Sequence, residues 1–176
     1  METNKPNHDV IQTLRTAHQN QTQLNMMADQ KANILIGTLV LVFTVVLTRL
    51  LQLLEGNQQL LMPIFVFVLM QLIPLVLTVL VLIPKNIDNL KQKDITNIQN
   101  PLFFGFFTRY SEQEYTNYLN SILVDNDSAR ALLVKDIYQI GLILKRKYRL
   151  LRLAYMYALL GILVPVLVSM YMFVVM

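Results

Sequence analysis

Three long apolar stretches alternate with polar segments along the chain and set its organisation. They cover residues 34–54, 60–83 and 153–175. Arg49 and Gln52 are the strongly polar residues of the first, and Gln71 is that of the second. Each has about 20 residues or more, which at about 1.5 Å per residue is enough to cross a hydrocarbon core about 30 Å thick. Because backbone groups in lipid must bond to one another, the pattern predicts three transmembrane helices.

The polar segments carry a helical repeat of apolar residues. Spacings of 4, 3, 4, 3 and 4 connect two sets of positions, Val10, Leu14, Ala17, Gln21, Leu24 and Ala28, and Leu133, Ile137, Ile140, Leu144, Lys147 and Leu151. Such spacing favours two stalk helices that pack along these seams and continue into the first and third spans. Ser111 and Glu114 form a capping-box pattern, which predicts the start of a further helix.

The chain is therefore expected to be an all-α integral membrane protein with three transmembrane helices and a helical cytoplasmic bundle. Three spans cannot enclose a water path alone, so a homo-oligomer is expected. The predicted parts are an N-terminal stalk (1–33), a first span (34–54), an outer loop (55–59), a second span (60–83), a cytoplasmic helical region (84–152) and a third span (153–175).

Lysine and arginine counts predict the orientation. The link 55–59 has no basic residue, whereas Lys5, Arg15 and Lys31 precede the first span and eleven basic residues lie between positions 85 and 152. Cytoplasmic segments of membrane proteins carry the excess of Lys and Arg. We therefore expect a multi-pass membrane protein with a cytoplasmic N-terminus.

Composition agrees with a membrane protein and argues against several classes of function. Hydrophobic residues make up 55% of the chain and charged residues 15%, with a mean hydropathy of +0.46. Without cysteine, and with only His8 and His18, thiol chemistry is excluded and neither a metal site nor another cofactor is expected. Catalysis is not expected. The net charge of +4 comes from residues that flank the spans, so we expect the lipid bilayer, and no nucleic acid, as a partner.

Three motifs resemble those of the bacterial Pycsar transmembrane effector family. They are MADQKANIL at 27–35; NPLFFG at 100–105, followed by EY at 114–115; and KDIYQIG at 135–141, leading to KYRLLRLAY at 147–155. The motifs occur in the order of the family and cover nearly the whole chain.

The resemblance implies a role in antiphage defence. In this family a partner nucleotide cyclase makes cyclic CMP or cyclic UMP on infection, the effector responds, and the inner membrane loses integrity, by pore formation or another route, so that the infected cell stops growing or dies. The chain lacks the β-roll that binds cyclic nucleotides in other proteins. An activating nucleotide would therefore bind the helical cytoplasmic part, or a partner would bind it.

Four residues are candidates for binding the nucleotide: Arg109, Lys135, Asp136 and Tyr138. A cyclic pyrimidine nucleotide needs a cation for its phosphate, an aromatic ring for its base and polar groups for the base edge. The alternative is that these are ordinary solvent-exposed helix residues.

A second set of candidates lies at the membrane boundary: Asp29, Lys31, Arg149 and Arg152. Asp29 is expected to pair with Arg149 or Arg152 and to hold a closed state, since losing one partner leaves an uncompensated charge. The alternative is that Asp29 and Lys31 only support the topology, and that the arginines attract anionic lipid. His18 is interpreted as an ordinary seam or surface residue.

Two other functions remain open from the sequence. The first is a membrane scaffold or regulatory subunit that docks a soluble partner enzyme through its cytoplasmic helices. The second is a small constitutive channel or lysis protein, for which nearly a hundred cytoplasmic residues would be surplus.

Overall fold

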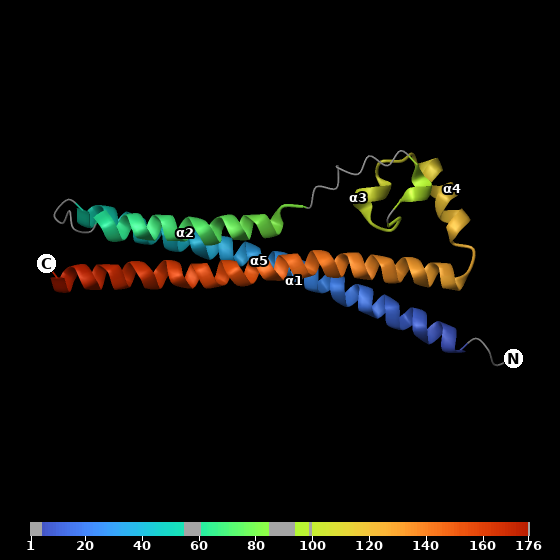
Figure 1. The fold of residues 1–176 in the computed structure, drawn as a ribbon, viewed down its shortest axis with the longest axis horizontal. Coiled ribbons are helices and arrows are strands. Elements are labelled where there is room, and N and C mark those ends of the chain that lie inside the picture. Colours follow the sequence, from blue (N-terminus) through green and yellow to red (C-terminus); the bar gives the residue numbers. More distant parts are fainter. Residues whose placement is uncertain (1–4, 55–60, 85–93, 99, 176) are drawn as a thin grey trace. The chain divides into compact units, whose positions relative to one another are not determined.

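The computed structural model describes residues 5–54, 61–84, 94–98 and 100–175, and the regular structure in these ranges is helical. The elements, in the order of Figure 1, are α1 (Lys5–Leu54), α2 (Leu61–Leu82), the 3-10 helix η2 (Ile95–Asn97), α3 (Phe104–Phe107), α4 (Glu112–Ile122) and α5 (Asn126–Val175). The predicted all-α class is confirmed. The predicted outer loop 55–59 lies outside the described residues, as do residues 85–93 of the predicted cytoplasmic region.

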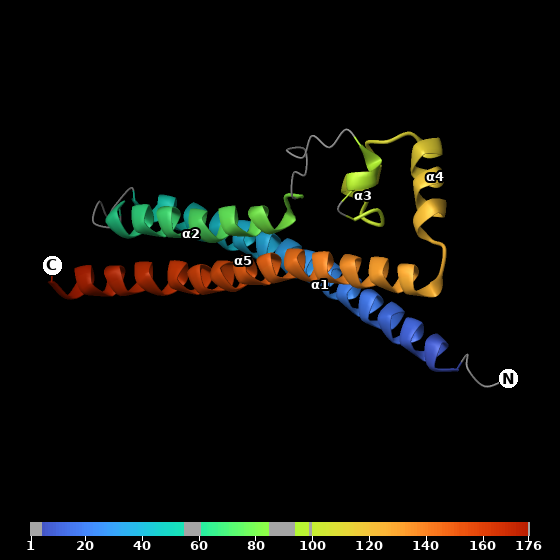
Figure 2. The same ribbon diagram turned by 45° about the vertical axis from the view of Figure 1, so that its right-hand side comes forward.

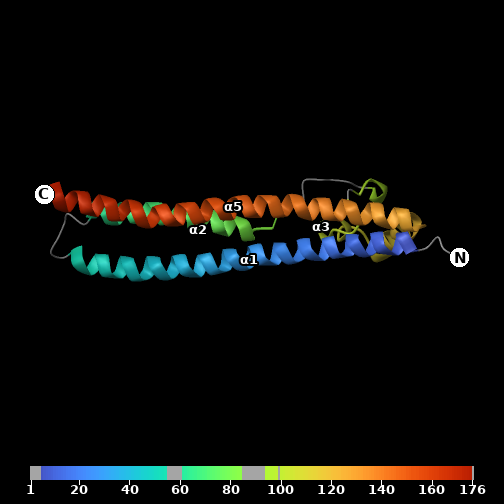
Figure 3. The ribbon, with the colours of Figure 1, turned by 90° about the horizontal axis from the view of Figure 1, so that it is seen from below.

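Two helices of 50 residues, α1 and α5, each join a polar segment to an apolar one without a break (Figure 3). Asp125 precedes α5, and its Oδ1 accepts a hydrogen bond from the Ser128 backbone N–H at 2.7 Å. This hydrogen bond is the main reason why the pKa of Asp125 is lowered. The predicted continuity of each stalk with its apolar span is confirmed. Together with α2, these are three helices long and apolar enough to cross a membrane.

The chain divides into two compact units. The polar unit comprises Met1–Asn25 and Pro84–Leu144, and the apolar unit comprises Met26–Ile83 and Lys145–Met176.

In the apolar unit, α2 turns one face inward. The buried residues of this face follow spacings of 3 and 4 and are Ile64, Phe67, Gln71, Pro74, Thr78 and Val81. Leu35 and Leu39 of α1 and Ala154 of α5 form the buried apolar cluster, and Phe43 stacks on Phe67 with ring centroids 6.0 Å apart. Ala28 and Ala32 are fully buried. Small residues of this kind let helix backbones approach closely in a membrane.

In the polar unit, the predicted capping box opens α4. The Ser111 hydroxyl accepts from the Glu114 backbone N–H at 3.3 Å, and the Glu114 carboxylate accepts from the Ser111 backbone N–H at 2.9 Å. The ring of Tyr115 stacks on Phe107 at 4.8 Å, and its hydroxyl donates to the Pro101 carbonyl at 2.9 Å. These contacts attach α4 to the turn before α3, and Figure 2 shows both short helices.

Candidate functional site

A buried carboxylate, that of Asp136, is the centre of a polar cluster in the polar unit. Asp136 lies on α5 and is 5% exposed. Its Oδ2 lies 2.8 Å from Nε2 of His18 on α1, and its Oδ1 accepts from the Asn100 side-chain amide at 2.7 Å. The tautomer of His18 decides which atom donates in this contact, because either ring nitrogen of a neutral imidazole can carry the proton. A charge is costly to bury without such partners, so the cluster favours this arrangement of the three segments.

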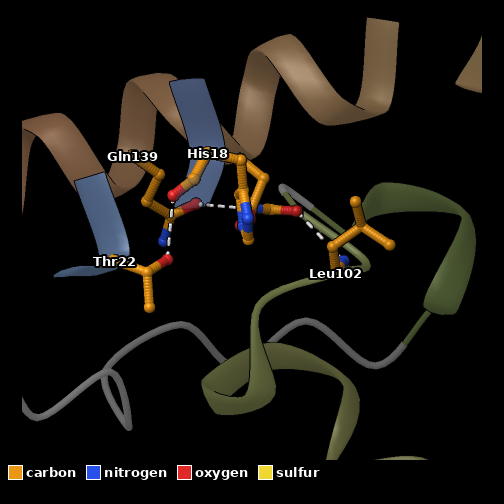
Figure 4. A network of polar contacts seen from close by, with 6 residues as sticks. His18, Thr22, Leu102 and Gln139 are labelled. Atoms are coloured by element: carbon orange, nitrogen blue, oxygen red, sulfur yellow. Dashed lines mark hydrogen bonds and ion pairs between the residues drawn. The ribbon is translucent and has the colours of Figure 1, made fainter. Parts of the chain in front are cut away.

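Asn100 uses every polar atom of its side chain and is fully buried. Besides its bond to Asp136, the amide nitrogen donates to Oε1 of Gln139 at 3.0 Å. The amide oxygen accepts from the Leu102 backbone N–H at 3.0 Å, which forms an Asx turn around Pro101. Figure 4 shows Leu102, Gln139 and His18 converging from three different segments. The NPL sequence thus supplies both a turn and the side chain that ties this turn to α5.

The structure separates the four predicted nucleotide-binding residues into two groups. Asp136 faces inward and both of its oxygens have partners within the chain, so it is not exposed to a ligand here; its role in ligand binding stays a prediction. Tyr138 is 69% exposed, and Lys135 and Arg109 are exposed as well. At about 100° per residue, Asp136 and Tyr138 lie on nearly opposite sides of α5. Lys135, Tyr138 and Arg109 therefore remain as exposed candidates.

A second interhelical pair lies in the apolar unit. The Lys147 ammonium of α5 donates to both carboxylate oxygens of Asp29 on α1, at 2.6 and 2.8 Å. The expected partners, Arg149 and Arg152, are exposed, so that pairing was wrong. Lys147 occupies the apolar seam of α5, which faces α1. Arg149 and Arg152 follow it by two and five residues, and at about 100° per residue they lie on the side of α5 away from this seam.

Lys31 has a different contact from that of its neighbour Asp29. Its ammonium lies 5.7 Å from the centre of the Tyr148 ring, within the range of a cation–π interaction. The two charged residues of the MADQK sequence, Asp29 and Lys31, thus have separate partners on α5, Lys147 and Tyr148. Among the residues that the structure describes, no three histidine or acidic side chains are grouped so as to hold a metal ion.

From the sequence, His18 was interpreted as an ordinary seam or surface residue, and its contact with Asp136 was not predicted. A signal for it was present: Asp136 is a lone acid directly beside the seam residue Ile137, and a carboxylate there needs a donor from the facing helix. The seam of α5 likewise contained Lys147, a cation at a position that otherwise repeats leucine and isoleucine. A charged residue in an apolar seam indicates a partner of opposite charge across that seam.

Comparison with known proteins places these residues in one family domain. The family model described as the Pycsar effector protein domain matches residues 12–174. That range includes the His18–Asp136–Asn100 cluster and the Asp29–Lys147 pair. Nothing among the curated proteins or the solved structures matches the chain.

Proposed function

Since the chain belongs to the Pycsar effector protein domain family, we propose that it defends bacteria against phage by impairing the inner membrane in response to a cyclic pyrimidine nucleotide. The observation that carries the proposal is the family match over nearly the whole chain, joined to three helices apolar enough to cross a membrane. The role of an antiphage effector follows from the family. The nucleotide signal and the effect on the membrane are the proposed parts.

The proposed orientation places the polar unit in the cytoplasm. The segments 1–33 and 84–152, which include the polar unit, hold 14 of the 15 Lys and Arg, and an excess of Lys and Arg marks cytoplasmic segments. The N-terminus is then cytoplasmic and the link 55–59 external. Family membership suggests an effector without catalysis, so we attribute its effect on the membrane to a change of its own structure there. Three helices cannot enclose water alone, and a pore requires a homo-oligomer.

We place the nucleotide on the exposed residues of the polar unit. Lys135 and Arg109 supply cations for the phosphate, and Tyr138 supplies a ring for the base. Lys135 and Tyr138 are three residues apart on α5 and share one face of this helix. The exposed Lys135 is the chain neighbour of the buried Asp136. A shift of this turn of α5 therefore also disturbs the contacts of Asp136 with His18 and Asn100. The cyclase that makes the nucleotide is the proposed functional partner.

The Asp29–Lys147 pair is the proposed latch of the resting state. α1 and α5 each run without a break through both units, so a change in the polar unit has a continuous path to this pair. A ligand shifts such an equilibrium only by its difference in affinity for the two states. Opening the pair costs less than breaking a buried one, because the Asp29 side chain is 37% exposed.

Dye release from liposomes that contain the full chain tests the proposal. Cyclic CMP or cyclic UMP should release the dye, and cyclic AMP should not. Lys135→Ala and Arg109→Ala should abolish the response, whereas Lys145→Ala, which removes an exposed lysine of the same helix, should leave it intact. Tight liposomes under both pyrimidine nucleotides would contradict the proposal. Tight liposomes together with tight binding of a soluble enzyme would favour the scaffold function instead.

A further inference from the structure

A polar side chain without partners lies in the middle of an apolar helix. Gln71 is 3% exposed, and neither its amide oxygen nor its amide nitrogen has a hydrogen-bond partner among the residues that the structure describes. It follows the first residue of α2, Leu61, by ten positions and precedes the last, Leu82, by eleven. At about 1.5 Å per residue this depth is near the centre of a bilayer. An amide left unpaired there is unfavourable in free energy.

Gly161 of α5 makes room for this side chain. A Cβ at position 161 would lie 3.3 Å from Cδ and 3.4 Å from Oε1 of Gln71. It would also lie 3.4 Å from the Met70 carbonyl oxygen. Residue 74 is proline, which has no N–H for the Met70 carbonyl four positions earlier. Two polar groups are therefore gathered against a glycine at the centre of the span.

The packing next to Gln71 is incomplete. A hollow of about 110 Å³ lies between α1 and α2, lined by Leu39, Val40, Phe43, Gln71, Leu72 and Leu75. This hollow is partly open to the outside of the unit, so α1 and α2 share fewer dispersion contacts here than two close-packed helices do.

From these observations we propose that Gln71 lines the pore of the activated protein, and that in the resting state its side chain packs against Gly161 and is buried there. In the resting state the amide of Gln71 is buried away from water and has no hydrogen-bond partner among the described residues. When α2 separates from α5, the amide and the Met70 carbonyl face water and recover hydrogen bonds, which favours the open state. This inference rests on the proposed function, because it assigns the water path through which the membrane would leak.

Cysteine accessibility tests whether Gln71 meets water. The chain has no cysteine, so Gln71→Cys introduces a single thiol. A charged, membrane-impermeant methanethiosulfonate reacts with the thiolate, which forms in water and not in lipid. In liposomes that contain the full chain, cyclic CMP or cyclic UMP should raise the labelling rate about tenfold or more, in step with the open population. Leu69→Cys is the control, since Leu69 lies at nearly the same depth on the exposed side of α2, and its rate should not change.

A second test needs no nucleotide. Gly161→Ala places a methyl group against the Gln71 side chain. It should displace this side chain from its buried position and cause dye release without a signal. Gly37→Ala is the matched control: Gly37 also lies in an apolar helix, but no atom lies within 4 Å of a Cβ added there. It should leave the liposomes tight. Gln71→Met, which keeps the length of the side chain and removes its amide, should require more nucleotide for the same release.

The outcomes separate this inference from the proposed function. If nucleotides release dye but Gln71→Cys stays unlabelled, Gln71 does not line the path, and the proposed function stands. If nucleotides do nothing, but Gly161→Ala leaks and Gln71→Cys is labelled in that background, the assignment of Gln71 holds and the nucleotide signal fails. If Gly161→Ala stays tight and Gln71→Cys is unreactive in every condition, the inference is overturned.

Discussion

The His18–Asp136 and Asp29–Lys147 pairs both join α1 to α5, and in both the partners are 118 positions apart, but their surroundings differ. The Asp136 side chain is 7% exposed and has Asn100 as a further donor, whereas that of Asp29 is 37% exposed and bonds to Lys147. A buried carboxylate with several donors is costly to disturb. An ion pair whose carboxylate is partly exposed adds less stability and is easier to break. The first pair suits a structural connection and the second suits a switch.

The apolar contacts of the two units differ in a parallel way. In the apolar unit, Ala28, Ala32 and Ala154 are fully buried. In the polar unit the seam is more open, with Val10 46% and Leu24 40% exposed, although both residues repeat at the expected spacing. Hydrogen bonds around Asn100 and Asp136 therefore define the packing of the polar unit to a greater extent than its seam does. The apolar unit depends on close packing of small residues, with Gln71 as its exception.

The largest effect is expected from Asp136→Ala. It removes one of the two acceptors of the buried Asn100 amide, leaving only Gln139, and it removes the partner of His18, at a cost of about 3–5 kcal/mol. Asp29→Ala should cost about 1 kcal/mol or less, because the Asp29 side chain is 37% exposed. Thermal unfolding of the full chain in detergent measures both. Lys145→Ala is the control on the same helix, since Lys145 is exposed. Equal losses of stability for Asp136→Ala and Asp29→Ala would remove the distinction between the two pairs.

A smaller effect on stability, but a larger one on function, is expected from the Asp29–Lys147 pair. Asp29→Asn and Lys147→Gln should each cause dye release without a signal, because about 1 kcal/mol changes the ratio of open to closed states about fivefold. Arg149→Gln removes an exposed charge two residues away and should leave the liposomes tight. The exchange Asp29→Lys with Lys147→Asp should restore the resting state.

A latch in which Lys147 takes no part would give a different result. Lys147→Gln would then behave like Arg149→Gln, and the exchanged pair would leak as much as Asp29→Lys alone. Asp29 would in that case act on topology rather than on gating.

Much of the fold could be predicted because it depends on local patterns. The spans follow from long apolar runs, the continuity of α1 and α5 from the lack of a breaker at their membrane boundaries, and the start of α4 from Ser111 and Glu114. The partners in the site depend on which residues of two helices face each other. Lys147, rather than Arg149, reaches Asp29 because of its rotation about α5. The spacing of the seam indicates that Lys147 faces α1, whereas the number of basic residues near the membrane does not indicate which of them does.

The contacts of Asn100 could not be predicted from local sequence patterns. NPL predicts a turn, but nothing local indicates that the Asn100 side chain bonds to a carboxylate 36 positions later. His18 is similar, since its partner is 118 positions away. The burial of Asp136 between these two residues is a product of tertiary packing. In the sequence the position was marked only by the motif KDIYQIG and by its place beside the seam residue Ile137.

The smallest expected effect concerns α4, which has no buried residue among those described and depends on its cap. Hydrogen bonds from Ser111, chiefly from its hydroxyl, hold the pKa of Glu114 below its ordinary value of 4.5. A carboxyl whose pKa is lowered by folding adds stability above its unfolded pKa, and this stability is lost as the pH falls through the lowered value. Ser111→Ala should therefore raise the pKa of Glu114 toward 4.5 and weaken the loss of α4 helicity in acid. Carboxyl chemical shifts of the full chain in detergent, followed against pH, measure the change. Thr116→Ala, an exposed substitution in the same helix, should leave the titration of Glu114 unchanged, and an equal shift in both variants would mean that the cap does not set this pKa.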